Sequence, residues 1–263
     1  MDGGSPVLTR LDHLVILTPD LGTAVERYTR LGFSVVAGGR HASGTHNALV
    51  AFADGSYLEL IAFFESDPGH RWWPALQQGG GFIDFCVESD DLRGDTERLQ
   101  RAGVSMQDPR PMSRIRPDGI EVRWELALPS PEFAGVLPFL IQDVTRRVER
   151  VPQAADHPNR IVGVDGVSIA VADVARARQS YERMLEQTGA RLDHEAPGGG
   201  GVRFRLGDQS VTLLSPGGGD DPVARWLAAR GPSPYFLRLR SRSPSRRGAW
   251  PESETGGVRI ELA

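Results

Sequence analysis

The chain has 263 residues, enough for one large domain or two small ones. Its hydrophobic content of 40% and its charged content of 24% are ordinary for a soluble globular protein. A net charge of -4 gives no basic surface of the kind that binds nucleic acid, so we expect no nucleic-acid partner. No run of residues is long and apolar enough to span a bilayer, and residues 1–10 lack the apolar segment of a secretory signal. The single cysteine, Cys86, cannot form an internal disulfide, and we expect a cytoplasmic protein without a membrane partner.

Residues 11–63 predict a unit with the order β-α-β-β-β. Apolar side chains fill most of both faces of residues 11–17, which indicates a strand covered on both sides. Alternation along this strand places His13 on one face and Asp12 on the other. A helix is expected next, capped near Asp20 and ended at Gly32, because apolar residues recur between them at helical spacing. Alternating patterns predict three further strands at residues 33–37, 48–53 and 57–63, the last two joined by a hairpin at Asp54-Gly55.

Weaker copies of this unit follow along the chain. A second copy begins at Phe82 with a strand, an acidic helix start, a helix and a glycine, and strands are expected around residues 121–128 and 136–142. A third copy covers residues 161–215, and a fourth is a remnant near the C-terminus. One such unit cannot cover its own sheet, whereas two units side by side form a curved sheet with a concave inner face and helices outside.

The repeats predict an α+β fold of βαβββ units paired into curved mixed sheets. We expect an N-terminal pair of units in residues 1–145 that carries the functional site. Residues 146–160 are expected to form a linker, and residues 161–263 a degenerate C-terminal pair.

Two polar residues stand out within apolar strands of the first unit. His13 lies on the first strand and Glu59 on the last, and a buried carboxylate needs a cation, hydrogen-bond donors or a wet cavity. Each residue alone could be a satisfied core group. Their matching positions on two strands of one unit point instead to a bound metal ion.

Several segments carry a resemblance to a known family: LDHLVILTPDL, GGRHASGTHNALVAF, YLELIAF, PDGIEVRWELA, LPFLIQD and HPN. Together they resemble the vicinal oxygen chelate superfamily and, more narrowly, the glyoxalase-like domain family of bacterial single-chain proteins. The resemblance implies a ligand cavity in the first pair of units and a divalent metal ion bound by strand residues.

The resemblance places His13 and Glu59 at the metal-ligand positions of the first unit. From the second unit it leaves Asp84, which aligns with His13, and Gln142 as candidate ligands. A set of this kind suits Zn, Ni, Mn or Mg, whereas two histidines and one carboxylate would suit Fe(II). A cavity without a metal ion remains an alternative, because members of the fold also bind ligands without one.

Other polar residues are candidates for contact with a substrate. We expect the loop before the third strand to aim hydrogen bonds into the cavity or to be pinned by its own side chains, and His41 could also move a proton. The second unit could close the cavity with arginines and a tryptophan, where an arginine would bind an anion. The candidates are His41, Thr45, His46, Asn47, Arg114, Arg116 and Trp124.

These features favour a metal-dependent lyase or isomerase of the glyoxalase type that acts on a small oxygenated molecule. Glu59 or His41 would be its catalytic groups, and its partner would be a small molecule bound by a monomer or homodimer. A binding protein that sequesters a small molecule, as in drug-resistance members of the fold, is one alternative. A dioxygenase is another.

Overall fold

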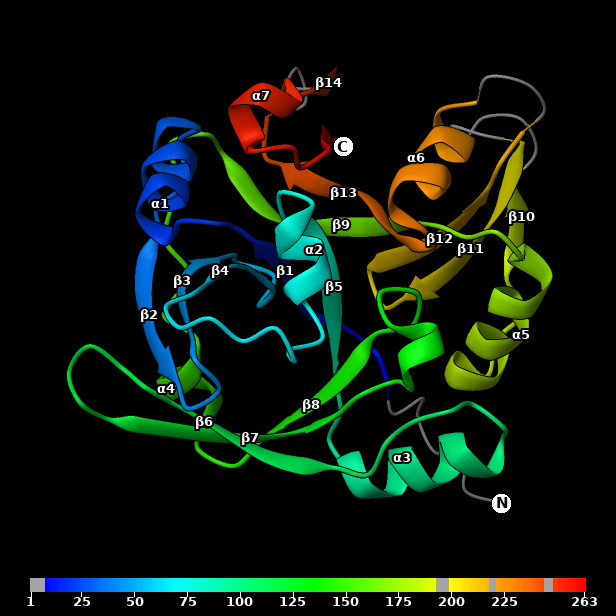
Figure 1. Cartoon of the computed structure of the whole chain (residues 1–263), viewed down its shortest axis with the longest axis horizontal. Coiled ribbons are helices and arrows are strands. Elements are labelled where there is room, and N and C mark those ends of the chain that lie inside the picture. Colours follow the sequence, from blue (N-terminus) through cyan, green and yellow to red (C-terminus); the bar gives the residue numbers. More distant parts are fainter. Residues whose placement is uncertain (1–7, 193–198, 218–220, 244–247) are drawn as a thin grey trace.

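The computed structural model describes residues 8–192, 199–217, 221–243 and 248–263 (Figure 1). Most of the N-terminal stretch expected to lack a secretory signal lies outside these ranges. Within them, no helix combines the length and the apolar character that crossing a bilayer requires.

Two sheets organise the described residues. The first is a closed barrel with the strand order β1-β4-β3-β2-β6-β7-β8-β5. Its strands are β1 (Leu11–Leu17), β2 (Val36–His41), β3 (Thr45–Ala51), β4 (Tyr57–Phe63), β5 (Gly81–Glu88), β6 (Arg110–Ile115), β7 (Glu121–Ala127) and β8 (Phe139–Asp143).

The second sheet is open and has the order β10-β11-β12-β9-β13-β15-β14. Its strands are β9 (Ile161–Ala170), β10 (Ala190–Leu192), β11 (Gly200–Leu206), β12 (Gln209–Ser215), β13 (Ser233–Ser241), β14 (Gly248–Ala249) and β15 (Ile260–Leu262). The helices are α1 (Leu21–Arg30), α2 (Trp73–Gln77), α3 (Leu92–Arg101), α4 (Arg147–Arg150), α5 (Val174–Leu185), α6 (Pro222–Arg230) and α7 (Glu252–Thr255), with a 3-10 turn at Pro131–Phe133. Figure 1 shows α1 and α3 on the outside of the barrel.

The first unit forms largely as its sequence predicts. Strand β1 is buried along its whole length, and β4 has the predicted bounds. Asp20 caps α1 by accepting a hydrogen bond from the backbone N–H of Thr23 at 2.6 Å. Gly32 follows the helix with φ of +84°, a conformation that glycine adopts at little cost.

Strands β2 and β3 differ from their predicted bounds. Strand β2 begins at Val36 rather than residue 33, and β3 begins at Thr45 rather than residue 48. The glycines of β2 and the polar start of β3 hide the usual strand pattern. Thr45 and Asn47 are nevertheless buried, because they face the polar interior of the barrel. Neither β6 nor α2 was predicted.

Each unit of the barrel places its first strand beside its last. Strand β1 runs parallel to β4, β5 runs parallel to β8, and β1 and β5 pair antiparallel between the units. A short pairing of β2 with β6 closes the barrel. The predicted α+β fold of paired units in curved mixed sheets is therefore confirmed, and in the first pair the curvature reaches full closure.

The second sheet packs against the barrel. Buried side chains of both sheets join in one hydrophobic core, and β13 contacts β5. The fully buried Tyr181 of α5 donates a hydrogen bond to the carbonyl of Val136 at 2.7 Å. The site-bearing barrel is thus supported from outside by the degenerate second half of the chain.

Candidate functional site

A small cavity lies inside the barrel. Side chains from both units line it, and the space open to the centres of water molecules is about 70 Å³. His13, His41 and Glu59 line it from the first unit, and Arg114 and Trp124 from the second. A cavity of this size suits a small molecule of a few non-hydrogen atoms.

A β-bulge brings two consecutive residues of β1 to the inside of the barrel. Along β1, the partners of Leu11 and His13 on β5 are the adjacent residues Val87 and Cys86, so Asp12 is the extra residue. Alternation alone places Asp12 and His13 on opposite faces, as the sequence predicted, but a bulge re-aims a side chain. Both side chains are consequently buried and in contact.

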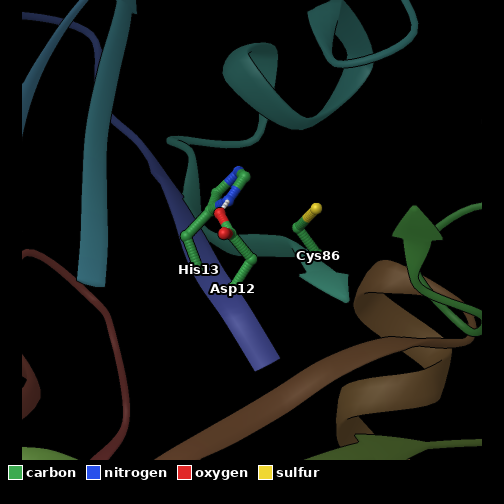
Figure 2. Close-up of side chains that lie close together, drawn as sticks. All are labelled: Asp12, His13 and Cys86. Atoms are coloured by element: carbon green, nitrogen blue, oxygen red, sulfur yellow. Dashed lines mark hydrogen bonds and ion pairs between the residues drawn. The ribbon is translucent and has the colours of Figure 1, made fainter. Parts of the chain in front are cut away.

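Asp12 fixes the imidazole of His13 (Figure 2). His13 Nδ1 lies 2.6 Å from Asp12 Oδ1. Burial by itself would raise the pKa of Asp12, but Arg150, the hydrogen bond from His13 and Arg147 hold it well below its ordinary value. Because an ionised carboxylate only accepts hydrogen bonds, Nδ1 of His13 carries the hydrogen. Nε2 is then the atom that His13 offers to the cavity.

Aromatic rings hold the same imidazole from two sides. The ring of Tyr57 stacks on His13 with centroids 4.7 Å apart, and the ring of Phe139 meets it edge to face at 5.3 Å. His13 is only 4% exposed. These contacts leave the ring little freedom to turn.

Two histidines and an asparagine surround the carboxylate of Glu59. Its Oε2 lies 3.5 Å from Nε2 of His13, and its Oε1 lies 3.9 Å from Nε2 of His41. The side-chain amide of Asn47 donates a hydrogen bond to Oε1 at 2.6 Å. Gly38 leaves room for this arrangement, since a Cβ there would lie 2.1 Å from Oδ1 of Asn47.

His41 enters the site as a neutral imidazole. Burial lowers its pKa to about 4, although the charge of Glu59 acts in the opposite direction. Nδ1 lies 2.9 Å from Oγ1 of Thr45, and the ring of Trp124 meets the imidazole edge to face at 5.9 Å. His41 therefore presents Nε2 to the cavity, as His13 does.

Helix α4 inserts one arginine into the end of the barrel. The buried guanidinium of Arg150 donates hydrogen bonds to Asp12, to Asp143 and to the hydroxyl of Tyr57. The backbone carbonyl of Arg150 accepts a hydrogen bond from Arg114. Strands β1, β4, β6 and β8 are thereby tied to a single residue of α4.

This arginine also supports both candidate ligands. Arg150 donates a hydrogen bond to Asp12, and Asp12 in turn accepts one from His13. On the other side, the carbonyl of Arg150 holds Arg114, whose Nη1 donates a hydrogen bond to Oδ1 of Asn47 at 3.3 Å. Asn47 in turn donates a hydrogen bond to Glu59.

The structure corrects the ligands expected from the second unit. Gln142 is not in the cavity, because its side chain donates to the carbonyl of Asp90 and accepts from the backbone N–H of Leu92 at the start of α3. Aligning Asp84 with His13, the strand registers give Phe139 as the counterpart of Glu59, since Cys86 pairs with Phe139 as Val15 pairs with Glu59.

Asp84, predicted to be a metal ligand, is instead engaged by residues of the loop after β4. It does not line the cavity, and its carboxylate forms an ion pair with Arg71 at 2.8 Å and accepts a hydrogen bond from the indole of Trp72 at 3.0 Å. The second unit thus contributes an aromatic ring and an occupied carboxylate where two metal ligands were expected.

Two expected substrate contacts also lie elsewhere. His46 does not line the cavity, and its ring packs against Phe64 at 5.8 Å. Arg116 contacts Asp118 and the carbonyl of Glu149 outside the cavity. The other expected contacts line the cavity or lie against its residues, namely His41, Thr45, Asn47, Arg114 and Trp124.

Sequence reasoning missed several residues of the site. Asp12 was assigned to the wrong face, and Arg150 lies in a segment predicted to be a linker. The loop after β4 adds His70, Arg71 and Trp72 to the cavity, and β6 adds Arg110. Burial of a polar residue within an apolar strand can be predicted from alternation along the strand. Loop residues have no periodic pattern, so their place in the cavity could not be predicted in this way.

Asp12, His13 and Cys86 form a compact group of possible metal ligands (Figure 2). The hydrogen bonds of Asp12 to His13, Arg147 and Arg150 already occupy its two oxygens. Burial raises the pKa of the Cys86 thiol well above its ordinary value. A metal ion here would have to displace both arginines and remove a proton that burial holds firmly on the Cys86 thiol, so this cluster is better explained as the support of His13.

The donors around Glu59 fit a divalent ion better. Two ligand atoms that are each about 2.1 Å from one ion lie roughly 3.0–3.4 Å apart in tetrahedral or octahedral geometry. The 3.5 Å between Nε2 of His13 and Oε2 of Glu59 is close to that separation. A ligating histidine commonly donates its other N–H to a carboxylate, as His13 does to Asp12.

Comparisons with known proteins agree with this architecture. The model of the family described as "Glyoxalase-like domain" matches residues 11–185. No curated protein sequence gives a significant match. A hypothetical protein from Staphylococcus aureus has a similar structure, with a TM-score of 0.70 and 14% identity, covering 96% of this chain and 98% of that one.

Two further solved structures are similar. A mutant of 4-hydroxymandelate synthase from Streptomyces coelicolor has a TM-score of 0.61 and 16% identity, covering 90% of this chain and 72% of that one. A xylose isomerase-like TIM barrel/4-hydroxyphenylpyruvate dioxygenase fusion protein has a TM-score of 0.50 and 13% identity, covering 93% and 39% respectively. At these identities the likeness shows the fold alone. Because the family model covers well over half of the sequence, the chain belongs to the glyoxalase-like domain family.

Proposed function

We propose that this protein is a divalent-metal-dependent enzyme, of the lyase or isomerase type, that acts on a small oxygenated molecule inside the barrel. One observation carries the proposal. The Nε2 atoms of the buried residues His13 and His41 both face the carboxylate of Glu59 in a small cavity inside the barrel. His13 and Glu59 would hold the ion, and His41 is the next available ligand.

The bound ion would supply Lewis acidity toward neighbouring oxygens of the substrate. Asp12 keeps the lone pair of His13 directed at the site, and Asn47 keeps Glu59 in place. The two groups able to accept a proton from the substrate are the Glu59 carboxylate and the neutral imidazole of His41. Trp124 and Phe139 cover the site with apolar surface, which limits access of water.

A dioxygenase is a second candidate. Two histidines and one carboxylate are the ligand set of many non-haem Fe(II) oxygenases, and His13, His41 and Glu59 have that composition. The identity of the bound metal separates this candidate from the first, since iron would favour it.

A binding protein without catalysis is a third candidate. The replacement of a second-unit ligand by Phe139 favours it, because an aromatic wall binds ligands without performing chemistry. Such a protein would bind its ligand equally well after metal removal.

Metal binding by purified variants tests the proposal. Equilibrium dialysis against Zn, Ni, Mn and anaerobic Fe(II), followed by elemental analysis, should show stoichiometric binding of at least one of these ions. Removing a ligand should abolish it, so we expect loss of binding in His13→Ala and in Glu59→Gln.

His46→Ala is the matched control, because it removes a histidine of the same unit that lies outside the cavity. This variant should bind metal as the unchanged protein does. Equal retention of metal by all the variants, or no binding by the unchanged protein, would contradict the proposal.

A further inference from the structure

Arginines that the proposed chemistry does not use also line the cavity. Arg71 comes from the loop after β4 and Arg110 from the start of β6, and both line the cavity that His13 and Glu59 also line. They bring positive charge to the lining of the cavity.

Arg71 is held in a fixed position. Its Nη2 forms an ion pair with Oδ2 of Asp84 at 2.8 Å, and its guanidinium lies over the rings of Trp72 at 4.7 Å and Phe139 at 5.2 Å. Since Phe139 also contacts His13, a single aromatic ring separates this guanidinium from the candidate metal ligand. Asp84 thus anchors an arginine beside the site.

Arg110 has no such anchor. Among the residues that the structure describes, no hydrogen bond or ion pair to its guanidinium is present. Arg71 and Arg110 line the same cavity, and partial burial and then repulsion by Arg71 lower the pKa of Arg110. Asp84 is the acidic partner of Arg71, and none is available to Arg110 in the described part of the chain.

A third arginine of the cavity has spare hydrogen-bonding capacity. Arg114 is 3% exposed, and its buried Nε has no hydrogen-bond partner within the described ranges. Leaving a buried donor unsatisfied costs roughly 1–3 kcal/mol. An acceptor on a bound molecule would remove this cost.

We propose that the cavity selects small organic acids, with the carboxylate of the ligand bound between Arg71 and Arg110. Arginine is well suited to this task, because its planar set of N–H groups matches a carboxylate. The remaining oxygens of the acid would face His13 and Glu59, and this part of the inference rests on the proposed function.

Pairs of acids and amides test the carboxylate preference. Glycolate, glycerate and 3-hydroxybutyrate are each compared with the corresponding amide by calorimetric titration, with inorganic phosphate as a separate anion. We expect an acid to bind more tightly than its amide. Arg110→Gln should weaken binding of the acid by roughly tenfold or more while leaving the amide unchanged.

Arg116→Gln is the matched control, since Arg116 follows the same strand, β6, but lies outside the cavity. Arg110→Gln should unfold at the same temperature as the unchanged protein or higher, because it relieves repulsion and breaks no hydrogen bond or ion pair within the described residues. Retained acid binding in a stably folded Arg110→Gln would overturn the inference. So would equal affinity for every acid and its amide, or binding of phosphate in preference to all the acids.

Repeating the titration after metal removal separates the two proposals. A preference for acids that survives chelation supports the arginine site even if the metal proposal fails. A protein that binds metal but shows no preference for acids contradicts only the arginine site.

Discussion

Asp12 sets the tautomer and the orientation of the His13 imidazole. Its oxygens accept hydrogen bonds from His13, Arg147 and Arg150. The two arginines therefore balance its charge, and its lone pairs are occupied. An imidazole held in this way cannot rotate to present Nδ1 to the cavity. The orientation of the candidate ligand is therefore decided by a residue that does not itself line the cavity.

Replacing Asp12 by Asn tests this role. The amide removes a buried charge opposite two arginines, which typically costs roughly 3–5 kcal/mol of stability. It also removes the negative charge that orients and polarises His13, so we expect metal affinity to fall roughly 10–100-fold. Affinity is measured by competition with a chromophoric chelator, under conditions in which circular dichroism shows the variant to be folded.

Two variants separate positioning from general damage. Asp143→Asn also removes a partner of Arg150 but does not touch His13, so it should lower stability while keeping metal affinity. Cys86→Ala should keep affinity as well, because the thiol is not a ligand in this account. A loss of metal binding in Cys86→Ala comparable to that in Asp12→Asn would instead place the ion in the cluster of Asp12, His13 and Cys86.

At the scale of elements, the sequence predicted what depends on periodicity. Strands β1 and β4 and helix α1 have clear patterns, and the cost of burying polar groups in apolar strands picked out His13 and Glu59. Asp12 was placed on the wrong face because a bulge shifts the alternation by one residue, and one sequence carries no signal of that shift.

The second unit shows the same limit. Gln142 was chosen because it lies near the end of the last strand and loosely matches Glu59, but the pairing of β5 with β8 places Phe139 at the matching point. Register between strands depends on tertiary packing, so counting along the chain could not find it. Arg150 was missed for a different reason, since a four-residue helix is too short to show a hydrophobic face.

At the scale of the whole molecule, the segment between the two sheets is firmly attached to the barrel. His157 accepts a hydrogen bond from the backbone N–H of Ser34 through Nδ1 at 3.0 Å, and Nε2 lies 3.1 Å from the carbonyl of Ala51. Both bonds require the neutral imidazole with its hydrogen on Nε2. Burial lowers the pKa of His157 below its ordinary value of 6.5.

This histidine should make stability depend on pH. Because its pKa is lower in the folded state, the unfolded chain binds the proton first as pH falls, and stability is lost below the ordinary pKa. We expect the free energy of unfolding, from urea titrations at about pH 7.5 and about pH 5.5, to fall less in His157→Gln than in the unchanged protein.

Asn159→Ala provides the comparison, because Asn159 also ties this segment to the barrel through the carbonyl of Leu31. That variant should lose stability by the same amount at both pH values. An unchanged pH dependence in His157→Gln would show that the acid sensitivity arises from the other buried histidines, such as His41.

The most direct test of the account is to locate a metal ion in the barrel. Crystals grown with Mn or Zn and measured at the absorption edge of that metal should show one strong anomalous peak within bonding distance of Nε2 of His13 and the carboxylate of Glu59. A peak against Nδ1 of His13 and the sulfur of Cys86, or no peak inside the barrel at full metal loading, would contradict it.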